Sequence, residues 1–165
     1  MPSVRRDIMA TMQISFLVDR PELASGLIPG LIEHWRDIVP GQTRAARERR
    51  FREHMNRDVL PIAWIAHQDG VAAGTASLRS HDLEGRLDLG PWLGGVYVDP
   101  PFRRQGIAAA LCRVVEEKAH AMGITRLYLF TLDQQSLYAR LGWEKFEGAI
   151  WQGRACDIMS KILGA

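Results

Sequence analysis

The stretch from residue 92 to residue 122 constrains the fold most, because a strand pattern there gives way to a helix pattern within a few residues. The run WLGGVYV at 92–98 is apolar and suits a buried strand. From Gly106 to Met122 the apolar residues recur on one helical face, and Gly123 supplies a common helix end. The order of strand, short turn and helix predicts a domain that mixes both kinds of element.

Further elements are expected on the N-terminal side of this unit. Residues 13–18 are a short apolar run typical of a strand. Asp19, with Glu22 three positions later, forms a capping-box pattern for a helix. The apolar spacing that follows predicts two short helices ending near Trp35, and a capped helix is expected over 43–57.

Two hairpins are also expected. Residues 62–67 and 73–80 read as strands on either side of Asp69-Gly70, a dipeptide that favours the tight turn of a hairpin. The remaining elements are expected to be a strand at 125–132, a short helix at 134–142 and a final hairpin that turns at Gln152 and Gly153.

The composition fits one intracellular globular domain. With 165 residues, 47% hydrophobic and 24% charged, the chain is expected to form a single domain over 1–165, with a flexible segment at 1–12. The net charge of +2 is too small to indicate a polyanion partner, and no apolar run suits a signal peptide or a membrane span. Cys112 and Cys156 lack Cys-x-x-Cys spacing and are expected to be reduced core residues. We therefore expect a cytoplasmic protein, monomeric or homodimeric, with no nucleic-acid or membrane partner.

The turn between residues 98 and 108 has the features of an anion-binding site. Backbone N–H groups and the positive end of a helix dipole are expected to meet there, and Gly106 lets a ligand approach the main chain. Arg103 and Arg104 add cationic donors suited to a diphosphate. Taken alone, these residues are equally consistent with a purely structural turn.

Two motifs resemble the GNAT superfamily of N-acetyltransferases. Arg103-x-x-Gly106-x-Ala108 matches the family's (Gln/Arg)-x-x-Gly-x-(Gly/Ala) loop, whose amides hold the pyrophosphate of coenzyme A, and Val98-x-Pro100 before it also fits. About 30 residues later, SLYARLGW matches the family's pattern of a tyrosine four residues before a glycine and an aromatic residue.

The resemblance extends over about 13–162 and implies a GNAT-like α/β fold. Such a fold has a mixed, mostly antiparallel twisted sheet of six to seven strands, flanked by about four helices, with a splayed central strand pair. The pantetheine arm of the coenzyme would pair with the main chain of strand 92–98, where the Gly94-Gly95 step also favours a bulge. The resemblance implies acetyl-CoA as the cofactor and these binding residues: Val96, Tyr97, Val98, Arg103, Arg104, Gln105, Gly106, Ile107, Ala108 and Tyr138.

Acetyl transfer to an amine needs a proton for the leaving thiolate, a donor to the carbonyl oxygen and a neutral amine. The resemblance implies that Tyr138 protonates the coenzyme sulfur and that the Val98 N–H is the carbonyl donor. Many GNAT enzymes carry a glutamate on the strand before the phosphate loop, but the equivalent position here is Trp92, and 93–98 holds no acid. His81 is the candidate base, because the ordinary pKa of histidine lies near neutrality.

Two acidic residues are further candidates for the base. Asp82 follows His81 and is a second candidate base. Asp133, before the helix that carries Tyr138, is a third candidate, but it is expected to cap that helix instead. The remaining histidines have no paired spacing, so no metal site is expected; they are His34, His54, His67 and His120.

The arginine-rich segment 43–57 is expected to be a helix with a solvated face. Glu48 can pair with Arg52, and Glu53 with Arg57, in the favourable i,i+4 order. These interleaved glutamates argue against nucleic-acid binding. In GNAT folds this region borders the acceptor site, and arginines turned inward would favour an acidic acceptor.

The acceptor is expected to be a small-molecule amine. The segment TLDQQSLYARLGW also resembles the part of the family that acetylates protein or peptide N-termini, which leaves that alternative open. A further alternative is a non-catalytic sensor of acyl-CoA, which the missing acid on strand 92–98 would suit.

Overall fold

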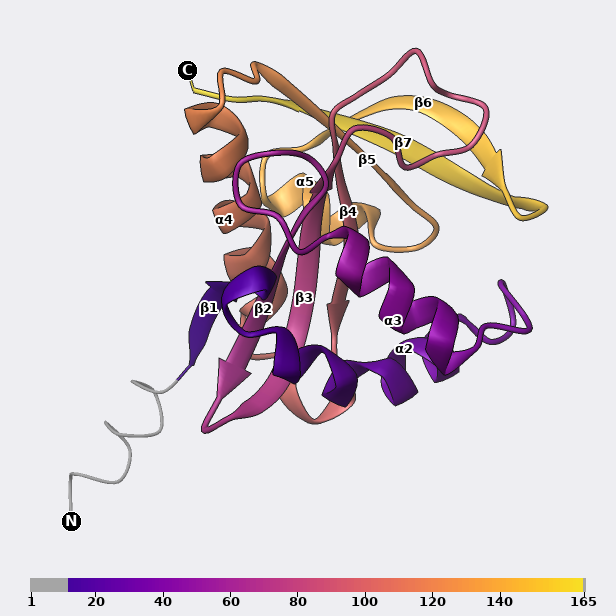
Figure 1. Ribbon diagram of the computed structural model, residues 1–165. Helices are drawn as coiled ribbons and strands as arrows, with labels where there is room; N and C mark the ends of the chain where they lie inside the picture. Colours follow the sequence, from indigo (N-terminus) through magenta and orange to yellow (C-terminus); the bar gives the residue numbers. More distant parts are fainter. Residues whose placement is uncertain (1–11, 165) are drawn as a thin grey trace.

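The computed structural model describes residues 12–164, which contain seven strands and four α-helices (Figure 1). The elements are, in chain order, β1 (Gln13–Phe16), η1 (Leu17–Asp19), η2 (Pro21–Leu27), α2 (Ile28–Trp35), α3 (Arg44–Glu53), β2 (Ile62–Gln68), β3 (Val71–Arg79), β4 (Trp92–Val98), η3 (Pro100–Phe102), α4 (Ile107–Ala121), β5 (Arg126–Thr131), α5 (Gln135–Arg140), β6 (Glu144–Trp151) and β7 (Arg154–Ile162). The segment 1–12, expected to be flexible, lies outside the described residues except for Met12.

All seven strands belong to one sheet, in the order β1-β2-β3-β4-β5-β7-β6. Neighbouring strands run antiparallel except β4 and β5, which are parallel. Across the described residues, β4 and β5 share a single register pair, Trp92 opposite Tyr128, and diverge beyond it. The predicted mixed α/β fold, with a mostly antiparallel sheet and a splayed central pair, is confirmed.

The two predicted hairpin turns are confirmed. Asp69 and Gly70, between β2 and β3, have φ angles of 52° and 75°. Gln152 and Gly153, between β6 and β7, have φ angles of 50° and 73°. Positive φ at both central residues fits a type I′ turn, whose twist matches the twist of the flanking strands.

Helices cover both faces of the N-terminal part of the sheet. Successive side chains of a strand point to opposite faces. Accordingly, Trp64 of β2 belongs to a core cluster with Leu111 of α4, whereas Ile65 belongs to a second cluster with Leu27 of η2 and Leu31 of α2. Figure 1 shows α2 and α3 in front of β2, β3 and β4. These strands are therefore enclosed between α4 on one side and the N-terminal helices on the other.

The prediction that Asp19 caps a helix is wrong. Residues 17–27 form two short 3-10 helices, neither of which has a side-chain cap. The carboxylate of Asp19 instead forms an ion pair with Arg57, which lies far away in the sequence. A tertiary ion pair thus takes the group that the local pattern assigned to the helix end.

Helix α3 is shorter than predicted, and its ion pairs differ from those expected. Thr43 does cap the helix, because its Oγ1 accepts a backbone N–H of the first turn at 3.1 Å. Glu48 pairs with Arg44 at 3.1 Å instead of pairing forward with Arg52. The helix ends before Arg57, so that residue is free to reach Asp19.

The predicted cap on α5 is also wrong. The helix begins without a side-chain cap, and Asp133 does not fill that role. Thr131 instead accepts a backbone hydrogen bond next to the start of the helix, from the N–H of Gln134 to its Oγ1 at 2.9 Å.

The cysteines behave as the sequence predicts. Cys112 and Cys156 are both free and buried. Burial raises the pKa of the Cys112 thiol, which keeps it protonated and poorly reactive. Separately, none of the helices within residues 12–164 is both long and apolar enough to cross a membrane.

Candidate functional site

The turn between β4 and α4 presents backbone donors to solvent. Arg104 and Gly106 have positive φ angles of 64° and 77°, and α4 follows without a side-chain cap. The N–H of Ala110 bonds the carbonyl of Gly106 at 3.1 Å, so the N–H groups of residues 107–109 precede the first helical bond and have no intrahelical partner. No atom lies within 4 Å of a Cβ built on Gly106, which leaves space beside these amides. Such a helix start is suited to binding a phosphate.

The main chain of Val98 faces the gap between β4 and β5. The N–H of Asp99 bonds the carbonyl of Ala73 on β3 at 2.8 Å. Because backbone groups alternate in direction along a strand, the neighbouring N–H and C=O of Val98 point away from β3. The Val98 carbonyl accepts a hydrogen bond from Arg103 Nε at 2.9 Å, which ties the turn to the end of the strand.

A bulge interrupts β4 where the sequence predicts one. Tyr97 lies opposite Thr75 and Gly94 lies opposite Ser77, so β4 carries one more residue than β3 over this interval. The extra residue allows Gly95 to take a φ of +61°. A Cβ on Gly95 would lie 2.6 Å from a guanidinium nitrogen of Arg79. The glycine therefore makes room for a side chain of the protein itself.

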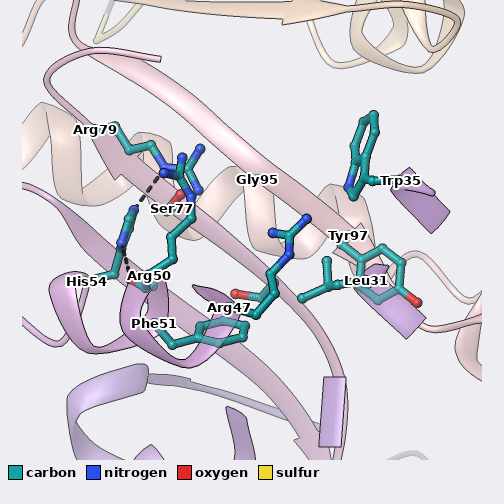
Figure 2. A pocket seen from close by; sticks show the side chains of 12 residues that line it. Leu31, Trp35, Arg47, Arg50, Phe51, His54, Ser77, Arg79, Gly95 and Tyr97 are labelled. Carbon is teal, nitrogen blue, oxygen red and sulfur yellow. Dashed lines mark hydrogen bonds between the residues drawn. The ribbon is translucent and has the colours of Figure 1, made fainter. Parts of the chain in front are cut away.

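A cavity of about 50 Å³ lies between α3 and the strands β3 and β4. Figure 2 shows side chains from helices and strands converging on it, among them Trp35 of α2 and Phe51 of α3. Gly95 and Tyr97 form its wall on the β4 side. The same strand therefore borders the cavity and leads into the phosphate-binding turn.

His54 and Arg79 are hydrogen-bonded to each other in the cavity wall (Figure 2). Arg79 Nε donates to His54 Nε2 at 2.9 Å, and Arg79 Nη1 pairs with Asp82 Oδ1 at 2.7 Å. Because an arginine N–H can only donate, His54 Nε2 accepts, so its Nδ1 carries the proton and donates to the Arg50 carbonyl at 2.7 Å. Burial and the charge of Arg79 lower the pKa of His54 to about 4. The ring is neutral at pH 7, and its lone pair is already engaged.

Two arginines of α3 turn toward the cavity. Arg47 and Arg50 line it together with Arg79 (Figure 2). Burial lowers the pKa of Arg47, and repulsion by Arg79 lowers the pKa of Arg50. Arg47 is half-buried, so the prediction of a solvated face fails there, whereas Arg49, Arg50 and Arg52 are exposed as expected. Arg50 differs from Arg49 and Arg52 because it also lines the cavity. The three-residue spacing, which places Arg47 and Arg50 on one side of a helix, is the sequence signal that could have indicated this.

Tyr138 is buried on the α4 side of the sheet. It belongs to the same core cluster as Leu111 and Cys112 and contacts Trp143 edge-on, with ring centroids 6.4 Å apart. Burial raises the pKa of its hydroxyl, so the group keeps its proton at neutral pH. Tyr138 does not line the cavity on the opposite face, and its role as a proton donor stays a prediction.

The structure separates the two candidate bases of the loop after β3. His81 is exposed and does not line the cavity. Asp82 lies against the bulge, since a Cβ on Gly94 would be 2.9 Å from its Oδ2. A carboxylate therefore stands beside β4 although the strand itself carries none, but Arg79 already pairs with it.

Tyr97 faces the cavity with its side chain. Its hydroxyl donates to Asp99 Oδ1 at 2.6 Å. Its role in binding the coenzyme stays a prediction. Within residues 12–164, no group of three or more His, Cys, Asp or Glu side chains is placed to hold a metal ion.

The chain matches the model of the acetyltransferase (GNAT) family over residues 28–143. It is 31% identical over 137 residues to an aminoglycoside N(6′)-acetyltransferase type 1 from Salmonella enteritidis, covering 76% of this chain and 93% of that relative. It is 25% identical over 145 residues to an amino-acid acetyltransferase from Ralstonia nicotianae, covering 82% of this chain but 30% of that relative. The crystal structure of an aminoglycoside 6′-N-acetyltransferase complexed with coenzyme A has a TM-score of 0.71 at 18% identity, covering 91% of this chain and 96% of the other.

The family match spans the features from which the sequence predicted it. Residues 28–143 include the bulged strand β4, the phosphate-binding turn, α4 and Tyr138. The architecture agrees as well, because the splayed parallel pair occurs within an otherwise antiparallel sheet. The chain therefore belongs to the acetyltransferase (GNAT) family and is an acetyl-CoA-dependent N-acetyltransferase.

Proposed function

We propose that the acetyl acceptor is the amine of a small molecule, bound in the cavity between α3 and β4. Two relatives support a small acceptor, since one is named for aminoglycosides and the other for amino acids. The cavity also supports it, because its volume of about 50 Å³ suits a small group. The observation that carries the proposal is that β4 borders both this cavity and the phosphate-binding turn.

The turn fits the diphosphate of acetyl-CoA. The unpaired amides of residues 107–109 and the open space at Gly106 suit phosphate oxygens, and the exposed guanidinium groups of Arg103 and Arg104 add positive charge. The Val98 N–H faces the gap between β4 and β5, where it would contact the part of acetyl-CoA that extends beyond the diphosphate. When bound there, acetyl-CoA supplies an activated acetyl thioester.

Two groups of this chain would assist the transfer. The Val98 N–H would donate to the carbonyl oxygen as negative charge develops on it. The Tyr138 hydroxyl, whose raised pKa keeps it protonated, would give its proton to the departing thiolate.

Within 12–164, the residues that line the cavity provide no group that could accept the acceptor's proton. Among the described residues that line the cavity, His54 is the one histidine and no carboxylate is present, and the His54 lone pair is taken by Arg79. We therefore expect the proton to leave through water at the cavity mouth. His81, exposed on the loop beside Asp82, is retained as the proposed base for that water.

A panel of amines with acetyl-CoA, analysed by mass spectrometry, tests this proposal. We expect acetylation of small amines or amino acids and none of peptides with free N-termini. Acetylation of peptides alone would replace the proposal with the peptide alternative. Binding of acetyl-CoA without transfer to any amine would favour the sensor alternative.

A further inference from the structure

Three guanidinium groups converge on the cavity, and their charges are unequally compensated. Arg79 donates a hydrogen bond to His54 and forms an ion pair with the Asp82 carboxylate at 2.7 Å. Asp82 neutralises that one charge, and His54 is neutral at pH 7. The cavity therefore carries a surplus of positive charge, which comes from Arg47 and Arg50.

Neither Arg47 nor Arg50 forms an ion pair within the described residues, so both positive charges are available to a ligand. Arg47 Nε donates to the neutral amide oxygen of Gln42 at 2.5 Å. Within residues 12–164, the Arg50 guanidinium has no hydrogen bond or ion pair. Asp82 and Glu53 attract Arg50 without forming an ion pair with it, and Glu48 pairs with Arg44.

From this charge distribution we infer that the acceptor amine also carries a carboxylate, which Arg47 and Arg50 bind while the amine is directed toward β4. This inference rests on the proposed function, because it names the substrate class of the same cavity. Arginine is suited to this contact, since its planar fork matches the two oxygens of a carboxylate.

Size and charge both support such an acceptor over a polyamine. The cavity is small, and the two arginines in its lining suit a carboxylate on a short carbon chain. An amine with several positive charges, such as an aminoglycoside, would place those charges against two guanidinium groups that have no ion pair within residues 12–164. A carboxylate would instead relieve the repulsion that lowers the pKa of Arg50.

The first experiment compares acceptors that differ only in the carboxylate. An α-amino acid, its decarboxylated amine, its amide and an aminoglycoside are each incubated with acetyl-CoA, and thiol release is followed. We expect kcat/KM for the amino acid to exceed that for its decarboxylated amine by about tenfold or more, the scale of a charge-assisted hydrogen bond. A preference for the decarboxylated amine or the aminoglycoside overturns the inference and leaves the proposed function standing. Failure to acetylate any amine contradicts both.

The second experiment assigns the selectivity to residues. Arg47→Gln and Arg50→Gln should raise KM for the amino acid and abolish its advantage over the decarboxylated amine, with little change in acetyl-CoA affinity. Arg49→Gln is the matched control, because Arg49 lies on the same helix and is exposed outside the cavity. Arg50→Lys, which keeps the charge, should restore part of the preference. The inference is overturned if the Arg49 and Arg50 variants behave alike, or if the cavity variants weaken acetyl-CoA binding instead.

Discussion

The turn proposed to bind the diphosphate and the cavity proposed to bind the acceptor are built on the same strand, but in different ways. The turn consists of consecutive residues, 98–109, and presents mainly backbone amides, whose positions follow from φ angles and a helix start. The cavity takes its residues from positions between Leu31 and Tyr97, and it presents side chains. The comparison teaches that the coenzyme side depends on local conformation, whereas the acceptor side depends on tertiary contacts. Substitutions should therefore affect one side without the other.

The largest expected effect concerns Tyr138, which lies on the α4 side and should affect neither binding step. In Tyr138→Phe the ring keeps its packing and only the proton is lost, so kcat should fall about a hundredfold or more. Steady-state kinetics and acetyl-CoA titration on the same preparation measure this. Tyr128→Phe is the control, since it makes the same change on β5. Unchanged kcat with a lowered melting temperature would make Tyr138 a packing residue.

Acidic pH should lower the stability of the protein, because His54 is buried in the cavity wall in its neutral form. Its folded pKa of about 4 lies below the ordinary 6.5. Below pH 6.5 the unfolded chain takes up a proton that the folded protein refuses, so stability falls until about pH 4. The difference corresponds to a loss of up to about 3 kcal/mol.

Urea denaturation at pH 7 and at about pH 4.5 measures this loss. The wild type should lose more unfolding free energy between the two conditions than His54→Gln, whose amide does not titrate. His120→Gln, an exposed histidine on α4, serves as the control. Equal losses in all three proteins would mean that His54 is protonated in the folded state.

Coenzyme binding should respond to a substitution at Gly106 but not to the same substitution at Gly123. Acetyl-CoA at a hundred times its dissociation constant should add about 2.7 kcal/mol to the stability of the wild type. Gly106→Val should remove this stabilisation, because its side chain would fill the open space beside the amides. Gly123→Val matches it at the other end of α4, since that glycine also has a positive φ, +83°, and no atom near its Cβ. Melting curves should show that both variants are strained but only one has lost the ligand.

The smallest expected effect concerns the start of α3. Thr43→Ala removes the oxygen that caps the helix and should cost about 1 kcal/mol of stability. Because α3 carries Arg47 and Arg50, KM for the acceptor should rise slightly while acetyl-CoA affinity stays constant. A change in acetyl-CoA affinity would show that the two sides are coupled.

The sequence predicts what short-range conformation determines. Both hairpin turns, the bulge at Gly95, the cap at Thr43 and the amphipathic face of α4 follow from neighbouring residues, and each is present. The phosphate-binding turn belongs to the same category. Its recognition rested on residues 98 to 108 together with the second motif at 136–143, and its role in binding phosphate stays a prediction.

Contacts between distant residues were missed. Asp19 and Arg57 are 38 positions apart, and their ion pair overrode a local capping pattern. Arg79 and His54 are 25 positions apart, and neither indicates by itself that they meet in a cavity wall. The inward turn of Arg47 and Arg50 depends on how α3 lies across β3 and β4. Helical spacing alone does not determine that orientation.

The splay of β4 and β5 also affects how the molecule moves. Within the described residues, a single register pair joins strands β1 to β4 to the other half of the sheet, which consists of β5, β7 and β6. Bending the sheet between β4 and β5 would therefore break few hydrogen bonds. Each half is internally well paired, and α4 with its core cluster spans them. We therefore expect the sheet to bend more easily along the line between β4 and β5 than elsewhere. A ligand lodged in the gap would brace it, slowing amide hydrogen exchange on both strands at once.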